Sequence, residues 1–141
     1  MKAVRKYMTS DPVCTVPTDT IEEVARFMKS EDVGSIPVVD THANKKLVGI
    51  VTDRDLVVKL LAEMRDIRSA RVGDAMSPDP VTCGPDDDLD AVLRLMADNQ
   101  VRRIPVVDEN GRVLGILAQA DVATRAANPE KTGEMVEEIS R

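Results

Sequence analysis

The chain has 141 residues, of which 43% are hydrophobic and 31% charged, and a formal net charge of −6 at pH 7. This composition is typical of one compact globular domain or two very small ones, since it is too apolar for intrinsic disorder and has no apolar run near the roughly 18 residues of a membrane-spanning helix. The negative charge opposes attraction to nucleic acid and anionic lipid, and the basic N-terminus lacks the apolar stretch of a secretory signal. We therefore expect a cytoplasmic protein with no nucleic-acid or membrane partner.

The cysteine and histidine content argues against metal and nucleophilic chemistry. Cys14 and Cys83 lie far apart and outside any Cys-x-x-Cys motif, and the single histidine, His42, lies in a polar segment where we expect it to be solvated. This spacing fits neither a disulfide framework nor a zinc site, and one histidine offers little for acid–base catalysis. We predict inert thiols, no metal, no required cofactor and no enzymatic activity; a redox role for the two cysteines is the alternative.

An internal repeat organises the chain. The matched segments are Met8–Val13 with Met76–Val81, Ile36–Asp40 with Ile104–Asp108, and Gly49–Ile50 with Gly115–Ile116. We place the first copy at residues 4–64 and the second at 74–127, with a connecting segment at 65–73 and a C-terminal tail at 128–141. The tail has three apolar residues at helical spacing among glutamates, which predicts either a frayed end or a short helix that faces a partner.

Both copies predict the same order of elements, strand, helix, strand, strand, helix. In the first copy we expect a strand at 13–16, a helix from Ile21, strands at 36–39 and 47–52, and a helix at 53–64; in the second, a strand at 81–83, a helix from Leu89, strands at 104–107 and 113–117, and a helix at 119–127. The first helix of each copy follows a proline and a cluster of N-cap residues and has one apolar face. Asn110-Gly111 is a hairpin signal between two β-branched runs. Pro37 and Pro105 are expected to open their strands, where a missing amide is tolerated.

One copy alone would have a small sheet, a single helical face and too little core to be stable. Two copies can bury those faces against each other about a pseudo-twofold axis, as repeat units do when neighbours complete a core. We therefore expect a mixed α+β protein with any ligand bound in the cleft between the copies.

The end of each copy contains an aspartate at the junction of a strand and a helix. In the first copy, Thr52 stands three residues before Asp55, the spacing of a capping box. In the second copy the hydroxyl is replaced by Ala118 while Asp121 is retained, which a capping role alone does not require. The alternative is a ribose-phosphate pocket, since a carboxylate at such a junction can accept hydrogen bonds from a vicinal diol.

Arg102 and Arg103 precede Ile104 in the second copy only; the first copy has Gly34-Ser35 at this place. Guanidinium groups bind phosphate in a two-pronged manner, so the pair fits a phosphate clamp in an otherwise acidic chain. The alternative is a solvated surface pair, as exposed charges commonly are.

These motifs resemble those of a known family. Met-x-x-x-Pro-Val at the start of each copy, Ile-Pro-Val-Val-Asp in the middle and Gly-Ile-Val-Thr-x-Arg-Asp at the end of the first copy resemble a tandem pair of CBS domains, also called a Bateman module, from about Val4 to Ala127. The resemblance implies two βαββα units that each contribute a three-stranded sheet and pack sheet to sheet with pseudo-twofold symmetry. It also implies binding of adenosyl compounds such as AMP, ADP, ATP or S-adenosylmethionine in the clefts, and homodimerisation through helices.

The resemblance also implies two ligand sites. The first would use Thr15, Ile36 and Pro37 around the base, Thr52 and Arg54 at phosphate, and Asp55 at the ribose; the second would use Cys83, Ile104 and Pro105 around the base, Arg102 and Arg103 at phosphate, and Asp121 at the ribose. In the second copy, Ala118 and Ala120 replace the hydroxyl and the arginine of the family pattern, which weakens the second site unless the arginine pair compensates.

Two functional hypotheses follow. The first is a regulatory module that binds an adenine nucleotide or another adenosyl ligand and passes its occupancy to a protein partner, which the sequence does not identify. The second is a ligand-free dimeric scaffold for partners in signalling or stress response.

Overall fold

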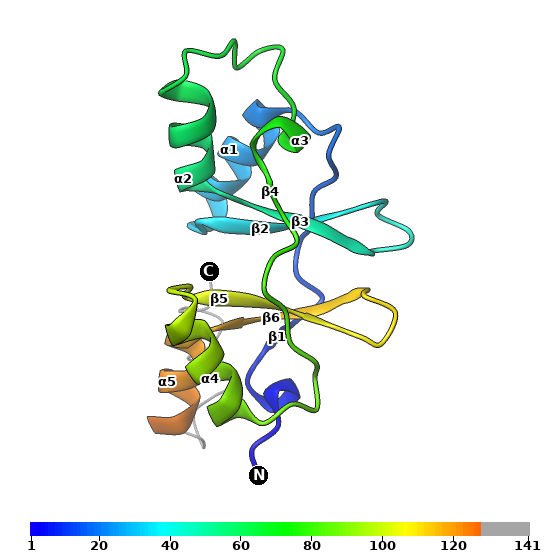
Figure 1. Ribbon diagram of the computed structural model, residues 1–141, viewed down its shortest axis with the longest axis vertical. Helices are drawn as coiled ribbons and strands as arrows, with labels where there is room; N and C mark the ends of the chain where they lie inside the picture. The colour runs from blue at the N-terminus through cyan, green and yellow to red at the C-terminus, as the bar shows by residue number, and fades with distance from the viewer. Residues whose placement is uncertain (128–141) are drawn as a thin grey trace. The chain divides into compact units, whose positions relative to one another are not determined.

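The computed structural model describes residues 1–127, which form two compact units (Figure 1). We call residues Val13–Pro80 the continuous unit, and Met1–Pro12 together with the chain from Val81 onward the split unit. Each unit contains one three-stranded sheet and several helices, so the predicted mixed α+β fold with two three-stranded sheets is confirmed. Among the described residues, no helix has both the length and the apolar character needed to cross a bilayer.

The continuous unit holds most of the first copy. Its elements are α1 (Ile21–Glu31), β2 (Ser35–Val39), β3 (Leu47–Thr52), α2 (Asp53–Asp55), η2 (Leu56–Leu61), α3 (Val72–Ala75) and β4 (Ser77–Pro78), with sheet order β2-β3-β4. Helix α1 begins after Thr20 because the Thr20 hydroxyl accepts a hydrogen bond from the Glu23 amide at 3.1 Å. Helix α2 runs on into η2, a π-helical segment in which the Ala62 amide donates to the Val57 carbonyl.

The split unit repeats this plan with the second copy. Its elements are η1 (Val4–Lys6), β1 (Thr9–Ser10), α4 (Leu89–Asp98), β5 (Arg103–Val107), β6 (Val113–Ala118) and α5 (Gln119–Ala127), with sheet order β1-β6-β5. Helix α4 begins after Asp88, whose carboxylate accepts from the Ala91 amide. β5 and β6 form the predicted hairpin, and Gly111 in its loop adopts a φ of 81°, which favours glycine.

The predicted strands at 13–16 and 81–83 are wrong. Each segment makes a single parallel bridge, Thr15 with Val38 and Cys83 with Val106. The third strand of each sheet comes instead from the other copy. β4, which lies just before residues 81–83, pairs with β3, and β1, which lies just before residues 13–16, pairs with β6. Prolines lie on both sides of Thr15 and of Cys83 in the sequence, and because proline lacks an amide hydrogen, a longer ladder cannot form there.

Pro37 and Pro105 lie in the middle of β2 and β5 and do not open them, so that prediction is also wrong. Both strands are at the edge of their sheets, where a missing amide costs no ladder hydrogen bond. The Pro37 carbonyl accepts the Thr15 amide at 3.0 Å, and the Pro105 carbonyl accepts the Cys83 amide at 3.2 Å. Each proline therefore helps to hold one residue of the preceding segment against the sheet.

The compact units do not coincide with the sequence copies. Val4 is fully buried in the core of the split unit, whereas Val72, its counterpart in the repeat, is fully buried in the core of the continuous unit. Ala70, in the connecting segment, is also part of the latter core. Each sheet thus takes its short third strand from the other copy, and that strand packs closely: a Cβ on Gly49 would lie 2.9 Å from the Ser77 carbonyl oxygen.

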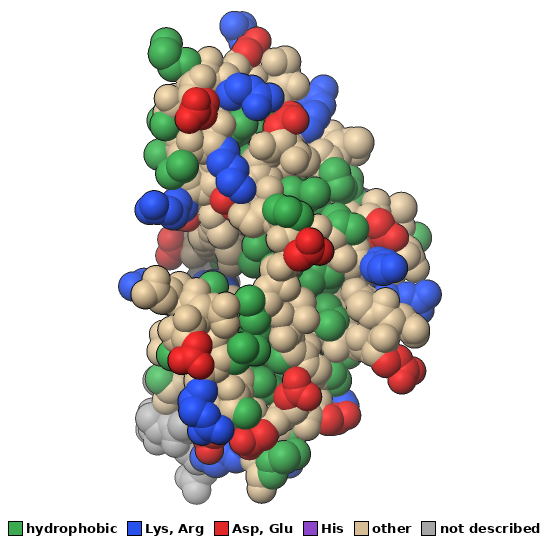
Figure 2. Space-filling view, in the orientation of Figure 1, with side chains coloured by type: hydrophobic (Ala, Val, Ile, Leu, Met, Phe, Trp, Pro, Cys, Tyr) green, Lys and Arg blue, Asp and Glu red, His purple; other side chains and the backbone are tan. Residues whose placement is uncertain are grey.

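Figure 2 shows the charged side chains on one face of the protein. On the face drawn in Figure 2, Lys and Arg side chains are interspersed with Asp and Glu, and no continuous basic area is visible. His42 is exposed in the loop between β2 and β3, as predicted. That face therefore lacks the basic stripe that a nucleic-acid-binding surface needs.

Candidate functional site

All residues predicted for the first site lie in the continuous unit. The register of β2 and β3 places Ser35 opposite Thr52 and Ile36 opposite Val51, and α2 begins directly after Thr52. Ile36, Thr52 and the start of α2 therefore meet at one end of the strand pair. Thr15 lies farther along the outer edge of β2, opposite Val38.

A pocket of about 210 Å³ connects two of these residues. Its lining is Val13, Cys14, Thr15, Asp19, Glu23, Val24, Phe27 and Ile36. The Thr15 hydroxyl donates to Asp19 Oδ2 at 2.6 Å, and the Val16 amide donates to the same oxygen, so this wall of the pocket is held rigidly. Because typical ligand pockets have volumes of roughly 300–1,000 Å³, this one fits a ring system better than a whole nucleotide.

Thr52 and Asp55 form a complete capping box. The Thr52 hydroxyl accepts from the Asp55 amide at 3.0 Å, and Asp55 Oδ2 accepts from the Thr52 amide at 2.9 Å. The capping interpretation therefore holds for the first copy, and the reciprocal pair fixes both side chains at the start of the helix. The Asp55 side chain retains 12% of its exposure, and neighbouring Arg54 is exposed.

Two further residues that the sequence analysis missed complete this cluster. Ser77 Oγ donates to Asp55 Oδ1 at 3.2 Å, and Lys59 Nζ lies 3.3 Å from the same oxygen. Lys59 Nζ also donates to Ser77 Oγ at 3.1 Å and to the Met76 carbonyl at 3.3 Å. The Lys59 contact has a sequence signal, since it lies four residues after Asp55 on the same helical face; Ser77 is distant in sequence and gave no such signal.

All residues predicted for the second site lie in the split unit. Arg103 is opposite Ala118 in the β5–β6 pair, and the Arg102 carbonyl accepts the Gln119 amide at 2.9 Å. The arginine pair is therefore next to the junction that lacks a hydroxyl. Asp121 is only 2% exposed, and Ile104 and Pro105 are buried beside Cys83 along β5.

Cys83 occupies the place of Thr15 in the second copy. Burial raises the pKa of its thiol to about 12, and the nearby Asp87 carboxylate acts in the same direction. A thiol with such a pKa carries almost no thiolate at neutral pH, which supports the prediction that Cys83 is inert. Within residues 1–127, no group of His, Cys, Asp and Glu side chains has the arrangement of a metal site.

Comparison with known proteins agrees with the fold and the repeat. The family model for the CBS domain matches residues 4–62 and again residues 72–128, which is most of the chain. The chain therefore belongs to the CBS-domain family and contains a tandem pair of CBS repeats. It is 41% identical over 141 residues to the uncharacterized protein YlbB of Bacillus subtilis (strain 168), covering 99% of this chain and 93% of YlbB.

Solved structures of CBS pairs have the same fold. The structure of CBSX2 in complex with AMP has a TM-score of 0.80 at 29% identity and covers 92% of this chain and 99% of that chain. The CBS domain pair of protein MJ0100, in complex with 5′-methylthioadenosine and S-adenosyl-L-methionine, has a TM-score of 0.78 at 26% identity, with coverage of 92% and 99%. Both of these structures were solved in complex with ligands that contain an adenosine moiety.

Proposed function

We propose that the protein is a non-enzymatic regulatory module whose continuous unit binds a ligand that contains adenosine. The observation that carries this proposal is the position of Asp55, which the capping box fixes at the same end of the β2–β3 pair as Ile36. A carboxylate held in this way can accept hydrogen bonds from the two ribose hydroxyls. The pocket lined by Thr15 and Ile36 offers space for the base.

The choice of adenosine as the shared element follows from the relatives. AMP, 5′-methylthioadenosine and S-adenosyl-L-methionine differ beyond the ribose, but all three have the same nucleoside part. In this chain, the Thr52 hydroxyl and the exposed Arg54 are the groups that would meet a phosphate of AMP, ADP or ATP. We therefore assign Asp55 to the nucleoside, and Thr52 and Arg54 to the group attached to its 5′ carbon.

For the split unit we propose a weaker site. Ala118 and Ala120 offer neither a hydroxyl nor a guanidinium, and Asp121 is almost fully buried. Arg103, opposite Ala118, is the cation best placed to replace Arg54, with Arg102 next to it. Phosphate binding there would depend on the β5 side of the junction and not on the helix.

Isothermal titration calorimetry and thermal-shift measurements with AMP, ATP and S-adenosylmethionine test these assignments. A ligand at about 100 times its Kd stabilises a protein by roughly 2.7 kcal/mol, which gives a shift of several degrees. We expect Asp55→Ala to abolish the tighter binding event and Asp121→Ala to leave it in place, with Asp53→Ala as the control for the loss of a nearby exposed charge. Unchanged binding by Asp55→Ala would overturn the site.

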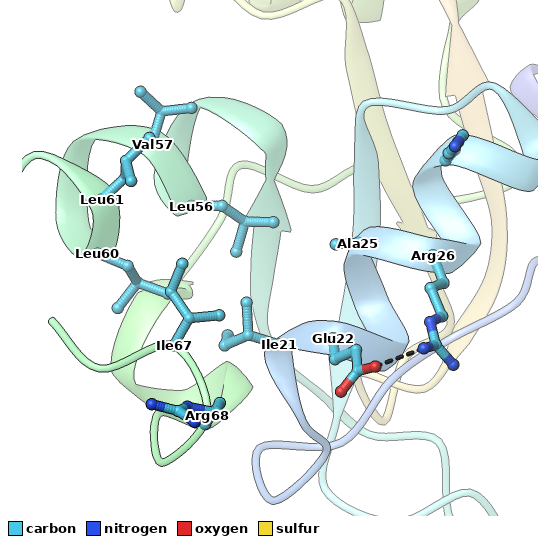
Figure 3. A pocket seen from close by; sticks show the side chains of 11 residues that line it. Ile21, Glu22, Ala25, Arg26, Leu56, Val57, Leu60, Leu61, Ile67 and Arg68 are labelled. Atoms are coloured by element: carbon cyan, nitrogen blue, oxygen red, sulfur yellow. Dashed lines mark ion pairs between the residues drawn. The ribbon is translucent and has the colours of Figure 1, made fainter.

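We also propose that the protein forms a homodimer through α1 and η2. Between these helices lies an apolar groove of about 550 Å³, which includes Leu56, Val57, Leu60, Leu61 and Ile67 (Figure 3). Val57 is 53% exposed and Leu61 61% exposed, and such side chains in one groove are typical of a surface that is buried by a partner. The groove's rim contains both signs of charge, with Glu22 paired to Arg26, so a second copy is an electrostatically acceptable occupant.

Size-exclusion chromatography with multi-angle light scattering, which gives the molar mass of the eluted protein, tests the proposed dimer. We expect a dimer for the wild type and for the control Glu63→Gln, which changes an exposed residue of the same segment, and a monomer for Leu61→Glu. A dimeric Leu61→Glu variant would place the interface elsewhere.

One observation favours a second candidate function, a ligand-free dimeric scaffold. In the continuous unit, Asp55 already has hydrogen-bond or ionic partners on both oxygens, so the fold does not need a ligand to satisfy it. Mass spectrometry of small molecules released from the denatured, freshly purified protein distinguishes the two functions. A co-purified nucleotide excludes the scaffold, whereas no adenosyl compound and no calorimetric response would favour it.

A further inference from the structure

The carboxylate of Asp55 is almost completely occupied by partners within the protein. A carboxylate offers about four lone-pair positions, two on each oxygen. Oδ1 faces both the Ser77 hydroxyl and the Lys59 ammonium, and Oδ2 accepts the Thr52 amide. One position is left, whereas a vicinal diol donates two hydrogen bonds.

The partners of Asp55 differ in how easily they can be displaced. The Thr52 bond, at 2.9 Å, belongs to the capping box and is local in sequence. The contacts of Oδ1 with Ser77 and Lys59 are longer, at 3.2 and 3.3 Å, and the Lys59 side chain is 38% exposed. Long, partly solvated contacts are weak, so a diol would displace those on Oδ1 first.

Lys59 also connects Asp55 to β4. Its ammonium donates to the Met76 carbonyl and to Ser77 Oγ, at the point where the chain is about to leave the continuous unit at Pro80. β4 has only two residues and pairs with β3 through Gly49 and Ile50. We call the set of contacts among Asp55, Lys59, Met76 and Ser77 the β4 clasp.

We propose that the β4 clasp and ribose binding at Asp55 are mutually exclusive, so that Lys59 lowers the affinity of the site for a nucleoside and ligand binding loosens β4. This inference rests on the proposed function, because it takes Asp55 as the group that binds ribose. It assigns to Lys59 a positioning role, since Lys59 acts through Asp55. Ligand occupancy would thereby affect β4, which lies just before Pro80, one of the two places where the chain passes from one unit to the other.

The decisive variant is Lys59→Met, which keeps the apolar stem and removes the ammonium. Calorimetry with AMP should give a Kd about threefold to tenfold lower than that of the wild type, the factor that corresponds to one net hydrogen bond no longer displaced. Ser77→Ala should change the Kd in the same direction and by a smaller factor. Lys46→Met makes the same charge change at the opposite end of the β2–β3 pair and should leave the Kd within about twofold.

Hydrogen exchange gives a second readout that a purely structural role for Lys59 would not produce. In the wild type, saturating AMP should speed exchange of the Met76, Ser77 and Asp79 amides; in Lys59→Met these amides should exchange faster without AMP and respond little to it. Unchanged or weaker AMP binding by Lys59→Met, with binding still lost in Asp55→Ala, overturns the clasp and leaves the proposed function standing. Absence of AMP binding by both the wild type and Lys59→Met, or full binding by Asp55→Ala, overturns the site itself and the clasp with it.

Discussion

The two strand–helix junctions occupy the same place in the repeat but have different chemistry. Between β3 and α2, a hydroxyl and a carboxylate cap the helix and the carboxylate keeps an exposed edge; between β6 and α5, Ala118 provides no hydroxyl and Asp121 is buried. The aspartate is thus retained whether a threonine or an alanine stands three residues before it. The comparison shows that the carboxylate and the cap are separable features, and that only the continuous unit combines both.

The residues that face these junctions from the neighbouring strand also differ between the two units. Arg103 faces Ala118, whereas the equivalent Ser35 faces Thr52. The Ser35 hydroxyl oxygen is buried and has no hydrogen-bond partner, which is an unfavourable arrangement for a polar atom. The arginine proposed to meet phosphate therefore lies on the helix side in the continuous unit, as Arg54, and on the strand side in the split unit, as Arg103.

The largest predicted effect is on the reactivity of Cys83. This residue lies in the segment before α4, where it is equivalent to Thr15 in the segment before α1. With a pKa of about 12 in place of 9.0, the thiolate fraction of Cys83 at pH 8 should be about a thousandfold below that of an ordinary cysteine. In a Cys14→Ser variant, we expect alkylation of Cys83 to be slower by at least this factor than in the unfolded chain. Alkylation within about tenfold of the unfolded rate would show that the segment opens readily.

The same pKa shift fixes the direction of the pH dependence at alkaline pH. Because the folded pKa is above the unfolded value, the stabilisation from protonated Cys83 is complete below pH 9 and is lost as the pH rises from about 9 to 12. Cys83→Ala should remove this part of the alkaline loss of stability, as measured by urea unfolding at several pH values.

The next largest effect concerns the close approach of the exchanged strands. A Cβ on Gly115 would lie 2.7 Å from Met8 Sδ and 2.8 Å from the Thr9 carbonyl oxygen, and one on Gly49 would meet Met76 and Ser77 in the same way at 2.9 Å. We expect Gly115→Ala and Gly49→Ala each to lower the free energy of unfolding by about 1–3 kcal/mol, because the backbone oxygen must shift. Gly73→Ala, whose nearest neighbours are at 3.4 Å, is the control; an equal loss there would contradict the explanation.

A smaller effect tests the capping difference directly. Thr52→Ala makes the first junction resemble the second and should cost about 1 kcal/mol in urea unfolding, because the Asp55 amide loses its acceptor. Thr52→Ser, which retains the hydroxyl, should lose much less. Equal losses in both variants would assign the effect to the threonine methyl group.

The smallest effect is expected in the loop between β2 and β3. The side-chain hydrogen bond from Asn44, assisted by the Thr41 and Lys46 amides, holds the pKa of Asp40 below 3.8. The ionised Asp40 carboxylate therefore stabilises the folded state above pH 3.8, and this stabilisation is lost as the pH falls through the lower pKa of the folded state. Asp40→Asn should show a flatter stability profile than the wild type in acid; parallel profiles would contradict this account.

The sequence was sufficient to predict most of the local structure. The N-cap residues Thr20 and Asp88, the apolar helix faces and the Asn110-Gly111 hairpin signal act over a few residues, and the structure confirms them. The placement of the predicted site residues in two sets, each within one unit, also follows from the repeat.

What the sequence did not predict depends on contacts between distant residues. The short runs around Thr15 and Cys83 have the apolar character of strands, yet the flanking prolines limit each to one bridge, and the two-residue strands β1 and β4 have no apolar alternation to reveal them. Ser77 was missed as a partner of Asp55 for the same reason, since it reaches Asp55 only after β4 has paired with β3.

Because each sheet takes its third strand from the other copy, the two units become able to fold at different times during synthesis. On the ribosome, the continuous unit is complete in sequence as soon as Pro80 has been added, whereas Thr9 and Ser10 must wait for β6, made roughly 100 residues later. At about 5–20 residues per second, this segment stays unpaired for on the order of 5–20 s. The unit that contains the Thr52–Asp55 pair is therefore the first that can fold, and Thr9 and Ser10 are among the last residues to pair.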